Sequence, residues 1–597
     1  MAVSTAFVNQ RRSYSGDLCT VRYVGKVEGT TGEWLGVEWD DPARGKHSGQ
    51  HQGVTYFACK NKHSTAGSFV RPSRAPDAQR GFLEALREKY ASEFEEVLAR
   101  QRLSGDVPVD AQQKPIEISG KVVEEVGFDK IRKQLAELQE LKIVLLDGLR
   151  VAGVLAQEGD PERHEAALRE IEQTCPKIVE LDLSRNLLNR WDEVSCICGR
   201  LKRLRKLKLN GNRFSPVEEG LTFEGITELQ LDDTLLSWDE ISSLSYQFPS
   251  LATLSASANQ FAALTTPIAG TITTLSLEHN SVTSLSSVQI LTSLENLEHV
   301  SLRGNNIGKV YDPSVTEKTL RFSPSLKSID LSRNSINTWE FVNQLSDVIP
   351  NLHSLRISGN PLFNHPVGSS IVTGMPEKPM TVDEAYMLTL SRLASLQVLN
   401  YSKITPKDRT NGELYYLSLI GKELSASPES AEWDILATHP RYRALCEIHG
   451  PPVISRVSMT TGPGASVNPR SVAARLVKMA FCLRSAADGA EMVKVKEIPR
   501  SFDTYQVKAI VARLFGLAPF SFRLIWETDE LDPVSRENIE ADEGWDSEDD
   551  GRTLGTTDAD RGLVRREVEL VDTTKDIGFW FQADLIEARV RVENAPL

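Results

Sequence analysis

The chain has 597 residues and a formal net charge of −14, and 40% of its residues are hydrophobic and 25% charged. A chain of this length is too long for one hydrophobic core, so we expect about three to five soluble globular domains. The acidic balance argues against nucleic acid as the main partner. The seven cysteines show no framework of spacings, which favours reduced thiols in the cytosol over disulfides or a metal site.

No segment of the sequence predicts insertion into a membrane. Residues 1–7 contain neither a basic nor an apolar run, so we expect no signal peptide. The strongest apolar run extends from Leu141 to Ala156 and is interrupted by Lys142, Asp147 and Arg150. These charges exclude a membrane span, and we expect an amphipathic helix there.

Residues 29–72 form short β-type runs that are rich in glycine and aromatic side chains. Glycines at 45, 49 and 53 permit a left-handed backbone and the close approach of another chain. Lys46 supplies a mobile point charge that suits a carboxylate. Residues 1–80 contain eleven Lys and Arg against seven Asp and Glu, a net charge of +4. A basic module on an acidic chain favours an acidic ligand, and capture of a terminal carboxylate is a known mode of peptide recognition. The rings that can line a flat apolar groove are Trp34, Trp39, Tyr56, Phe57 and Phe69.

This block resembles the CAP-Gly domain family, a small β-barrel that captures acidic C-terminal tails ending in an aromatic residue. The resemblance covers roughly residues 7–75, and we place the domain at 1–75. It implies a tail-binding site made of Trp34, Trp39, Gly45, Lys46, His47, Ser48, Gly49, Phe57 and Phe69. The alternative is that these rings only fill the barrel core. The usual family motif Gly-Lys-Asn-Asp-Gly is Gly-Lys-His-Ser-Gly here, which leaves tail affinity and selectivity open.

The next segment, residues 76–170, is rich in Glu, Lys, Leu and Ala. Its apolar residues recur at helical spacing from Phe82 to Leu98 and again from Ile131 to Leu141. We therefore expect a helical linker and an N-terminal cap for the region that follows.

Nine segments of the central region share apolar residues at positions 1, 4 and 6 and usually asparagine at position 9. From residue 186 to residue 360, successive ninth positions lie 21 to 29 residues apart. This period predicts leucine-rich repeats, an α/β solenoid whose stacked coils share one core. We place the solenoid and a C-terminal cap at 171–450. The segments begin at Ile178, Leu204, Ile226, Leu251, Ile272, Leu297, Leu326, Leu352 and Leu396, and the last lacks the asparagine.

The residues between the repeat leucines are expected to project onto a concave face. This mixed polar surface is typical of a protein-binding solenoid, although a rigid spacer with a solvated face is the alternative. The candidate binding residues are Lys206, Lys208, Glu228, Gln230, His299, Asp330 and Arg356.

The C-terminal third begins with a segment at 405–450 that we expect to be helical, followed by a Gly-, Pro-, Ser- and Thr-rich flexible linker at 451–469. Residues 470–597 then predict two strands, a helix at Thr504–Leu514 and a strand at Phe522–Trp526. This order resembles an α+β ubiquitin-like β-grasp domain. An acidic insertion at 540–550 is expected to be a solvated loop. The sequence does not end in Gly-Gly, so we expect no conjugation through it.

The order CAP-Gly, leucine-rich repeats and ubiquitin-like domain resembles the tubulin-folding cofactor E family along the whole chain. The resemblance implies a cytoplasmic, cytoskeleton-associated chaperone that binds the acidic tail and the body of α-tubulin. It implies assembly and dissociation of the α/β-tubulin dimer with other tubulin-folding cofactors. Degradation-linked proteins are further candidate partners of the ubiquitin-like domain.

The main alternative is a microtubule-associated adaptor that binds the polymer or plus-end proteins. A basic Ser/Pro-rich stretch or a long coiled coil would favour that adaptor, and the sequence contains neither. An enzyme is not expected, because the sequence contains no phosphate-binding loop, nucleophile elbow or His-Glu-x-x-His motif. We expect no cofactor, no metal, no nucleic acid and no membrane.

Overall fold

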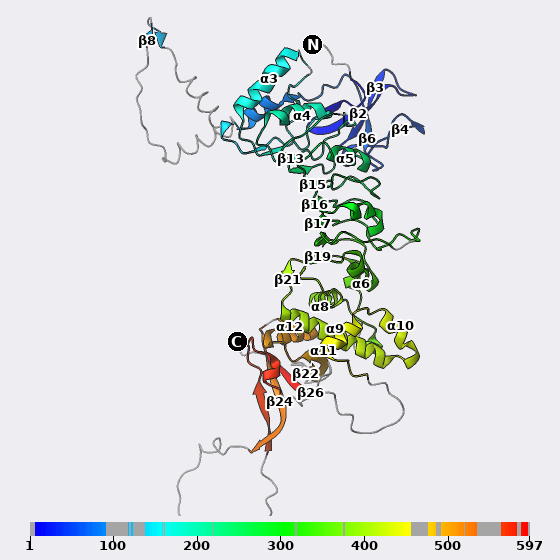
Figure 1. Ribbon diagram of the computed structural model, residues 1–597, viewed down its shortest axis with the longest axis vertical. Coiled ribbons are helices and arrows are strands. Elements are labelled where there is room, and N and C mark those ends of the chain that lie inside the picture. Colours follow the sequence, from blue (N-terminus) through cyan, green and yellow to red (C-terminus); the bar gives the residue numbers. More distant parts are fainter. Residues whose placement is uncertain are drawn as a thin grey trace, which may run out of the picture. The chain divides into compact units, whose positions relative to one another are not determined.

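The computed structural model describes residues 6–90, 117–118, 121–122, 138–454, 476–533, 563–581 and 587–594. Within these ranges, residues 158, 160, 219, 317–318, 374–376, 485–490 and 519 are excluded. The chain divides into two compact units (Figure 1). The first unit contains Met1–Leu362 and Val398–Tyr401, and the second contains Phe363–Gln397 and Ser402–Leu597.

The first unit begins with a small antiparallel barrel whose strands pair in the order β1-β2-β3-β6. Its inward-facing residues form one buried cluster that includes Tyr14, Val37 and Trp39. The strands are β1 (Arg11–Tyr14), β2 (Asp17–Lys26), β3 (Glu33–Trp39) and β6 (Gly67–Val70), with the hairpin of β4 (Gln50–His51) and β5 (Val54–Thr55) and the 3-10 turn η1 (Pro42–Arg44).

The segment after the barrel joins it to the solenoid within the first unit. Strand β7 (Arg80–Gly81) pairs in parallel with β11 (Val151–Gly153), and residues 82–90 are helical as predicted. A short hairpin of β8 (Glu117–Ile118) and β9 (Lys121–Val122) and the helix α3 (Pro161–Thr174) follow. The rest of the predicted helical stripe, including Leu98 and Ile131, lies outside the described residues.

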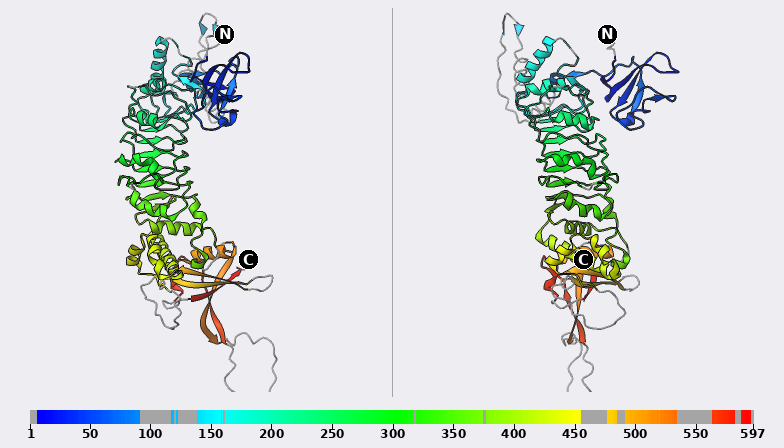
Figure 2. Two further views of the ribbon diagram at one scale, coloured as in Figure 1. Left: turned by 90° about the vertical axis from the view of Figure 1, so that its right-hand side faces the viewer. Right: turned by 45° about the vertical axis from the view of Figure 1, so that its right-hand side comes forward.

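Parallel strands stacked in chain order form the solenoid, as Figures 1 and 2 show. Each strand occupies positions 3 to 5 of its repeat and pairs in register with the same positions of the next coil, except at the shorter β20. The strands are β10 (Ile143–Leu145), β12 (Glu180–Asp182), β13 (Lys206–Lys208), β14 (Glu228–Gln230), β15 (Thr253–Ser255), β16 (Thr274–Ser276), β17 (His299–Ser301), β18 (Ser328–Asp330), β19 (Ser354–Arg356) and β20 (Val398–Leu399).

A ladder of buried asparagines links the coils. The Asn280 amide donates to the carbonyls of Leu277 at 3.0 Å and Ala256 at 3.2 Å. Its carbonyl accepts from the backbone N–H groups of Asn259 at 2.9 Å and Phe261 at 3.1 Å. One side chain thus satisfies backbone groups that leave the strands of two coils.

Other side chains make hydrogen bonds of the ladder in two coils that lack asparagine at position 9. Thr234 uses its hydroxyl to donate to Leu231 at 3.0 Å, and the last coil supplies Asn400 from position 5, which accepts from Ile357 at 2.9 Å.

The expectation of an amphipathic helix at Leu141–Ala156 is wrong, because this run forms a further coil of the solenoid. Leu141, Val144 and Leu146 occupy positions 1, 4 and 6 of the repeat, and β10 pairs in parallel with β12. Leu149 stands at the asparagine position, so a search that relies on asparagine misses this coil. Parallel pairing determines the structure here because the apolar residues are buried against the next coil.

Each of four coils carries a helical segment on the return from its strand. Helix α5 begins with a capping box in which Ser237 and Glu240 satisfy each other's backbone N–H groups. The segments are α4 (Trp191–Arg200), α5 (Trp238–Ser245), η2 (Leu285–Ser293) and α6 (Trp339–Val348).

The second unit contains a group of helices and a mixed sheet. Its predicted helical segment at 405–450 is helical, with a buried Glu413 that accepts from Arg441 at 3.0 Å. The elements are α7 (Ser370–Thr373), α8 (Val382–Arg392), β21 (Ser402–Lys403), α9 (Pro406–Ala426), η4 (Glu429–Ala431), α10 (Glu432–Ala437) and α11 (Tyr442–His449). The 3-10 turn η3 (Pro361–Asn364) precedes them.

The mixed sheet has the order β23-β22-β26-β24-β25, with β22 and β26 parallel. Helix α12 follows the second strand, so the predicted strand–strand–helix–strand order is confirmed. Most of the predicted linker and the acidic insertion at 540–550 lie outside the described residues. The elements are β22 (Leu476–Arg484), β23 (Glu491–Pro499), α12 (Thr504–Phe515), β24 (Phe522–Pro533), β25 (Leu563–Glu569), η7 (Ile577–Phe579) and β26 (Glu587–Asn594).

Across the described residues, no helix combines the length and the apolar character that crossing a membrane requires.

Candidate peptide groove and repeat face

The loop at 45–49 is fixed against strand β6. The backbone N–H of Lys46 donates to the carbonyl of Gly67 at 2.7 Å. A Cβ atom on Gly45 would lie 1.8 Å from a neighbouring carbonyl oxygen, and one on Gly49 would lie 1.9 Å from another. Gly49 also has a φ of +102°, so both positions require glycine. The loop therefore presents its side chains from a rigid backbone.

Beside this loop, aromatic rings gather around Phe69. The centroid of its ring lies 5.0 Å from His47, 5.6 Å from Tyr56, 5.7 Å from Phe57 and 6.4 Å from Trp34. Phe57 is buried, while the other four rings are half-buried. The cluster is thus an apolar surface that remains open on one side, as a bound aromatic residue requires.

Trp39 does not belong to this cluster, so its prediction as a groove residue is wrong. Its side chain is 2% exposed and packs edge-on against Tyr14 in the barrel core, with centroids 6.2 Å apart. The last residue of β3 faces inward because side chains alternate along a strand. Sequence alone did not separate this core ring from the groove rings.

The polar side chains of the loop differ in their partners. Lys46 and Ser48 are exposed, and Lys46 makes no ion pair with any residue that the structure describes. Its ammonium group is available to a carboxylate. The backbone N–H of Gly49 donates to Nδ1 of His47 at 3.0 Å. The neutral ring therefore carries its proton on Nε2, which is left as a hydrogen-bond donor.

The electrostatic surroundings of His47 favour that neutral form. Burial lowers the pKa of His47 from 6.5, and the charges of His51 and Lys46 lower it further. A neutral imidazole with an Nε2–H donor stands where the CAP-Gly motif usually has asparagine, whose amide is also a neutral donor.

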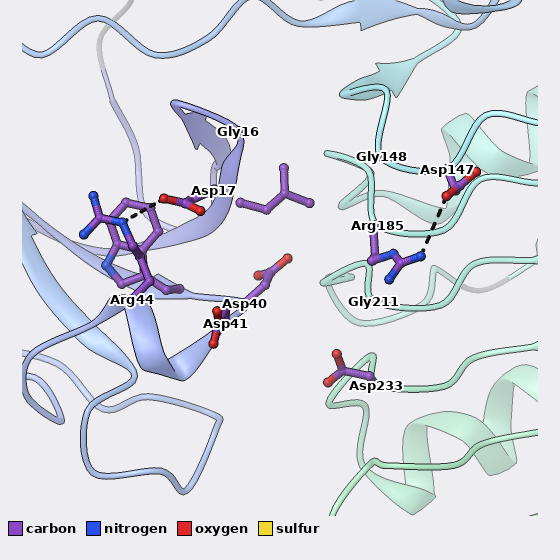
Figure 3. A pocket seen from close by; sticks show the side chains of 12 residues that line it. Gly16, Asp17, Asp40, Asp41, Arg44, Asp147, Gly148, Arg185, Gly211 and Asp233 are labelled. Carbon is purple, nitrogen blue, oxygen red and sulfur yellow. Dashed lines mark hydrogen bonds and ion pairs between the residues drawn. The ribbon is translucent and has the colours of Figure 1, made fainter.

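A cleft of about 500 Å³ lies between the barrel and the first coils, within the first unit (Figure 3). Its wall is acidic, and Arg44 and Arg185 are paired with Asp17 at 2.7 Å and Asp147 at 3.7 Å. An acidic tail would be repelled here, so this cleft is distinct from the groove. The charged lining residues are Asp17, Asp40, Asp41, Arg44, Asp147, Arg185 and Asp233.

An ion pair inside the barrel, between buried Arg11 and half-buried Asp40, also contacts the solenoid across this cleft. The Arg11 guanidinium donates to both carboxylate oxygens of Asp40 at 2.6 Å and to the carbonyl of Asn186 at 3.1 Å. Arg213, from the second predicted repeat, lies 3.9 Å from the same carboxylate. Burial alone would raise the pKa of Asp40, but Arg11 and Arg213 keep it below its ordinary value of 3.8. The barrel is therefore tied to the solenoid by charge.

At the N-terminal end of the repeat face, the predicted lysines are already paired. Lys206 contacts Glu228 at 2.9 Å and Lys208 contacts Glu180 at 2.6 Å. Gln230 donates to Glu228 at 3.2 Å. These residues lie together on the strand face as predicted, but they neutralise one another across neighbouring strands.

The C-terminal end of the repeat face is different. His299 is exposed, whereas Asp330 is buried and pairs with Arg356 at 3.4 Å. The Arg356 guanidinium also stacks on the ring of Tyr401, 3.8 Å from its centroid. Tyr401 lies outside every predicted site, because the last repeat lacks the asparagine that marks the others.

Comparison with known proteins agrees with this architecture. Residues 8–75 match the family model of the CAP-Gly domain. The chain is 31% identical over 541 residues to tubulin-specific chaperone E of Bos taurus, covering 88% of this chain and 93% of that protein. It is 29% identical over 536 residues to tubulin-specific chaperone E of Homo sapiens, covering 87% and 92%. Identity to tubulin-folding cofactor E of Arabidopsis thaliana is 26% over 518 residues, covering 85% and 88%.

A CAP-Gly barrel joined to a leucine-rich-repeat solenoid defines a multidomain protein with two candidate protein-binding surfaces. The Bos taurus relative covers 88% of this chain, well beyond the CAP-Gly domain alone. The chain belongs to the tubulin-specific chaperone E family.

Proposed function

We propose that this chain is a tubulin-folding chaperone that binds α-tubulin and acts with partner cofactors in assembling and dissociating the α/β dimer. Family membership supports tubulin as the cargo. The observation that carries the binding mode is Lys46, which has no ion-pair partner among the described residues and stands beside the open rings around Phe69. The chain would act through differential binding of two states of its cargo, in the cytoplasm, and not through bond chemistry.

The groove is proposed to bind the acidic, aromatic-ended tail of α-tubulin. Lys46 would pair with the terminal carboxylate, His47 Nε2 would donate a hydrogen bond and the half-buried rings would receive the aromatic residue. Ser48 is exposed beside them and contributes a hydroxyl. Lys46→Ala should weaken binding of a tail peptide by roughly 1–3 kcal/mol, the scale of a charged hydrogen bond.

The test is fluorescence anisotropy with the full chain and a labelled tail peptide. Lys62→Ala is the matched control, because it removes an exposed lysine of the same barrel. The control should bind like the unmodified chain, and amidation of the peptide's C-terminus should weaken binding as Lys46→Ala does. Equal binding of a neutral scrambled peptide would refute the groove.

The repeat face is proposed to bind the folded body of tubulin, while the groove binds only the tail. Two weak sites on one chain gain affinity through effective concentration. If deleting the solenoid leaves tubulin affinity unchanged, the repeats are a rigid spacer instead.

The sheet of the second unit is proposed to be a ubiquitin-like domain that recruits another cofactor or a degradation-linked protein. Its strand order and the position of α12 support the β-grasp fold. Ion pairs join it to helices of the same unit, with Lys496 3.5 Å from Glu384 and Arg513 2.8 Å from Asp383. These contacts favour a docked module over a freely tethered one.

Truncation at about residue 465 tests this proposal. Tubulin binding should survive, because both proposed tubulin sites lie earlier in the chain. Dissociation of the dimer with a partner cofactor should fall. Full dissociation activity of the truncated chain would show that the domain is dispensable.

A further inference from the structure

Charge is distributed unevenly along the repeat face. On the strands β12 to β14 the lysines and glutamates pair with one another, as described for Lys206 and Lys208. A partner that docks there must first break those pairs. Pairs between exposed or half-exposed groups add little stability, but they also leave little net field to attract a ligand.

Three arginines occupy three consecutive coils at the other end of the face. Arg303, Arg333 and Arg356 follow or belong to the paired strands β17, β18 and β19. Arg333 is exposed and Arg303 is half-exposed, and neither forms an ion pair with a residue that the structure describes. Arg356 pairs with Asp330 at 3.4 Å, and its side chain remains 42% exposed.

The side chain of Arg333 lies over the next coil, which carries Arg356. A Cβ on Gly359 would come within 3.2 Å of Cγ of Arg333, so the Arg333 stem lies over the glycine of the next coil. That coil also carries Arg356. Adjacent strands are about 4.8 Å apart, so the three coils that carry these arginines lie within roughly 10 Å of one another along the solenoid.

Tyr401 completes this surface at a conformational cost. Asn400 has a φ of +47° and Tyr401 a φ of +72°, so two consecutive non-glycine residues adopt the left-handed region. Such a conformation is unusual for a bulky residue and persists where the surroundings impose it. Asn400 is held by hydrogen bonds to Leu355 at 3.0 Å and Ile357 at 2.9 Å. The Tyr401 ring is 73% exposed and stacks on Arg356.

We propose that Arg303, Arg333, Arg356 and Tyr401, here named the arginine end, form a docking site for an acidic surface of a folded protein cargo. The inference rests on the proposed function and names the part of the solenoid that binds the tubulin body. Arginine recognises carboxylates with two parallel hydrogen bonds, and arginine and tyrosine are enriched where interfaces concentrate their binding energy. Stacking on Tyr401 pre-orients Arg356, so less freedom is lost on binding.

The chemistry favours a protein surface over nucleic acid. The chain carries a net charge of −14, which opposes a polyphosphate backbone. Asp330, buried under Arg356, further lowers the local positive charge. Separate carboxylates on a folded surface match three guanidinium groups that stand on separate coils.

The experiment uses the full chain and α/β-tubulin from which the acidic C-terminal tails have been removed by limited proteolysis. Tail removal isolates the repeat face from the groove. Arg333→Ala with Arg356→Ala should weaken binding about tenfold or more, measured by biolayer interferometry. Lys177→Ala with Lys202→Ala is the matched control, because it removes two paired lysines of the same unit that lie outside the predicted repeat face. It should change binding by less than about threefold.

Tyr401→Gly separates binding from folding. Glycine accepts a positive φ without strain, so this variant should unfold at the same or a higher temperature than the unmodified chain. It should nevertheless bind tail-free tubulin about tenfold more weakly. Loss of both stability and binding would indicate a structural residue and would overturn its role as an anchor.

Other outcomes also decide the proposal. Unchanged binding by the double arginine variant, or a large loss in the lysine control, would overturn it. A loss that occurs only when the tails are present would assign the arginine end to the tail and would overturn it as well. If the unmodified chain does not bind tail-free tubulin at all, the proposed function of the repeats fails, which is distinguishable from failure of this site.

Discussion

Replacing Asp40 by asparagine should open the CAP-Gly barrel, because it leaves the charge of Arg11 buried without its carboxylate. Arg11 is 1% exposed, and both of its terminal nitrogens lie 2.6 Å from the carboxylate oxygens. Asparagine keeps the shape but removes the negative charge. Removing one partner of a buried pair costs about 3–5 kcal/mol, because the remaining ion is uncompensated.

An exposed pair of the same barrel provides the control. Arg44 and Asp17 lie 2.7 Å apart, with side chains 40% and 43% exposed. Their separation is nearly that of the buried pair, so the comparison isolates burial. Arg44→Ala should cost about 0–1 kcal/mol, the usual value for surface pairs.

Hydrogen exchange of the full chain, followed by mass spectrometry, measures both variants locally. Amides of β1 and β2 should lose protection by roughly 100- to 4,000-fold in Asp40→Asn, since each 1.4 kcal/mol is a factor of ten. Arg44→Ala should lose less than about tenfold. Similar losses in both variants would refute the reasoning that burial of the Arg11 charge makes the Arg11–Asp40 pair the more important one.

The pH dependence of amide protection in the barrel gives an independent check of the role of the Arg11–Asp40 pair. The folded pKa of Asp40 is below 3.8, so its contribution to stability is present above that value and disappears as the pH falls through the folded pKa. The unmodified barrel should lose protection in this acidic range. The Asp40→Asn variant should lack this acid step.

Three further predictions concern the groove and the ladder. Since burial and neighbouring charges lower the pKa of His47 from 6.5, the loop bond from Gly49 is present above pH 6.5 and is lost as the pH falls through the folded pKa. Tail-peptide anisotropy should therefore change between pH 7.5 and about pH 5 in the unmodified chain and stay flat in His47→Asn. Gly49→Ala should abolish peptide binding, because its Cβ would lie 1.9 Å from a carbonyl oxygen, whereas Gly53→Ala, also at positive φ but in open space, should retain it. Asn280→Ala should lower the unfolding free energy of the solenoid by about 2–4 kcal/mol, since it leaves buried amides unpaired, and exposed Asn306→Ala should change it little in thermal unfolding.

Periodicity made most of the solenoid predictable from the sequence, and it failed where one marker was missing. Leu141, Val144 and Leu146 follow the apolar pattern of the other coils, but Leu149 replaces the asparagine. Without that residue, an apolar run with scattered charges also fits an amphipathic helix. Only the pairing of β10 with the strand of the next coil distinguishes a solenoid coil from an amphipathic helix here. Strand pairing depends on tertiary structure and cannot be read from the local sequence.

The binding surfaces were predictable in kind but not in every residue. The glycines of the loop could be recognised because few other residues adopt their conformations. Trp39 and Trp34 have the same side chain, and only the pleat of β3 decides which one is buried. The pairing of Lys206 with Glu228 does have a sequence signal, because both stand at position 3 of neighbouring repeats.

Because the barrel is held to the solenoid near Asp40, a cargo that binds both the groove and the arginine end needs a tail of a minimum length. The barrel is tied to coils near β12 and β13, whereas the arginine end lies on β17 to β19. Six strand spacings separate β12 from β18, which corresponds to about 29 Å. An extended tail spans at most about 3.6 Å per residue, so at least about eight residues must separate the body contact from the captured terminus. A barrel in a fixed position cannot bind a shorter tail while the body is bound at the arginine end. The gain in affinity from two linked sites is then lost abruptly below this length. Asp40→Asn should relax this limit, because it removes the 3.9 Å ion pair between Asp40 of the barrel and Arg213 of the solenoid, and a released barrel can move toward a shorter tail.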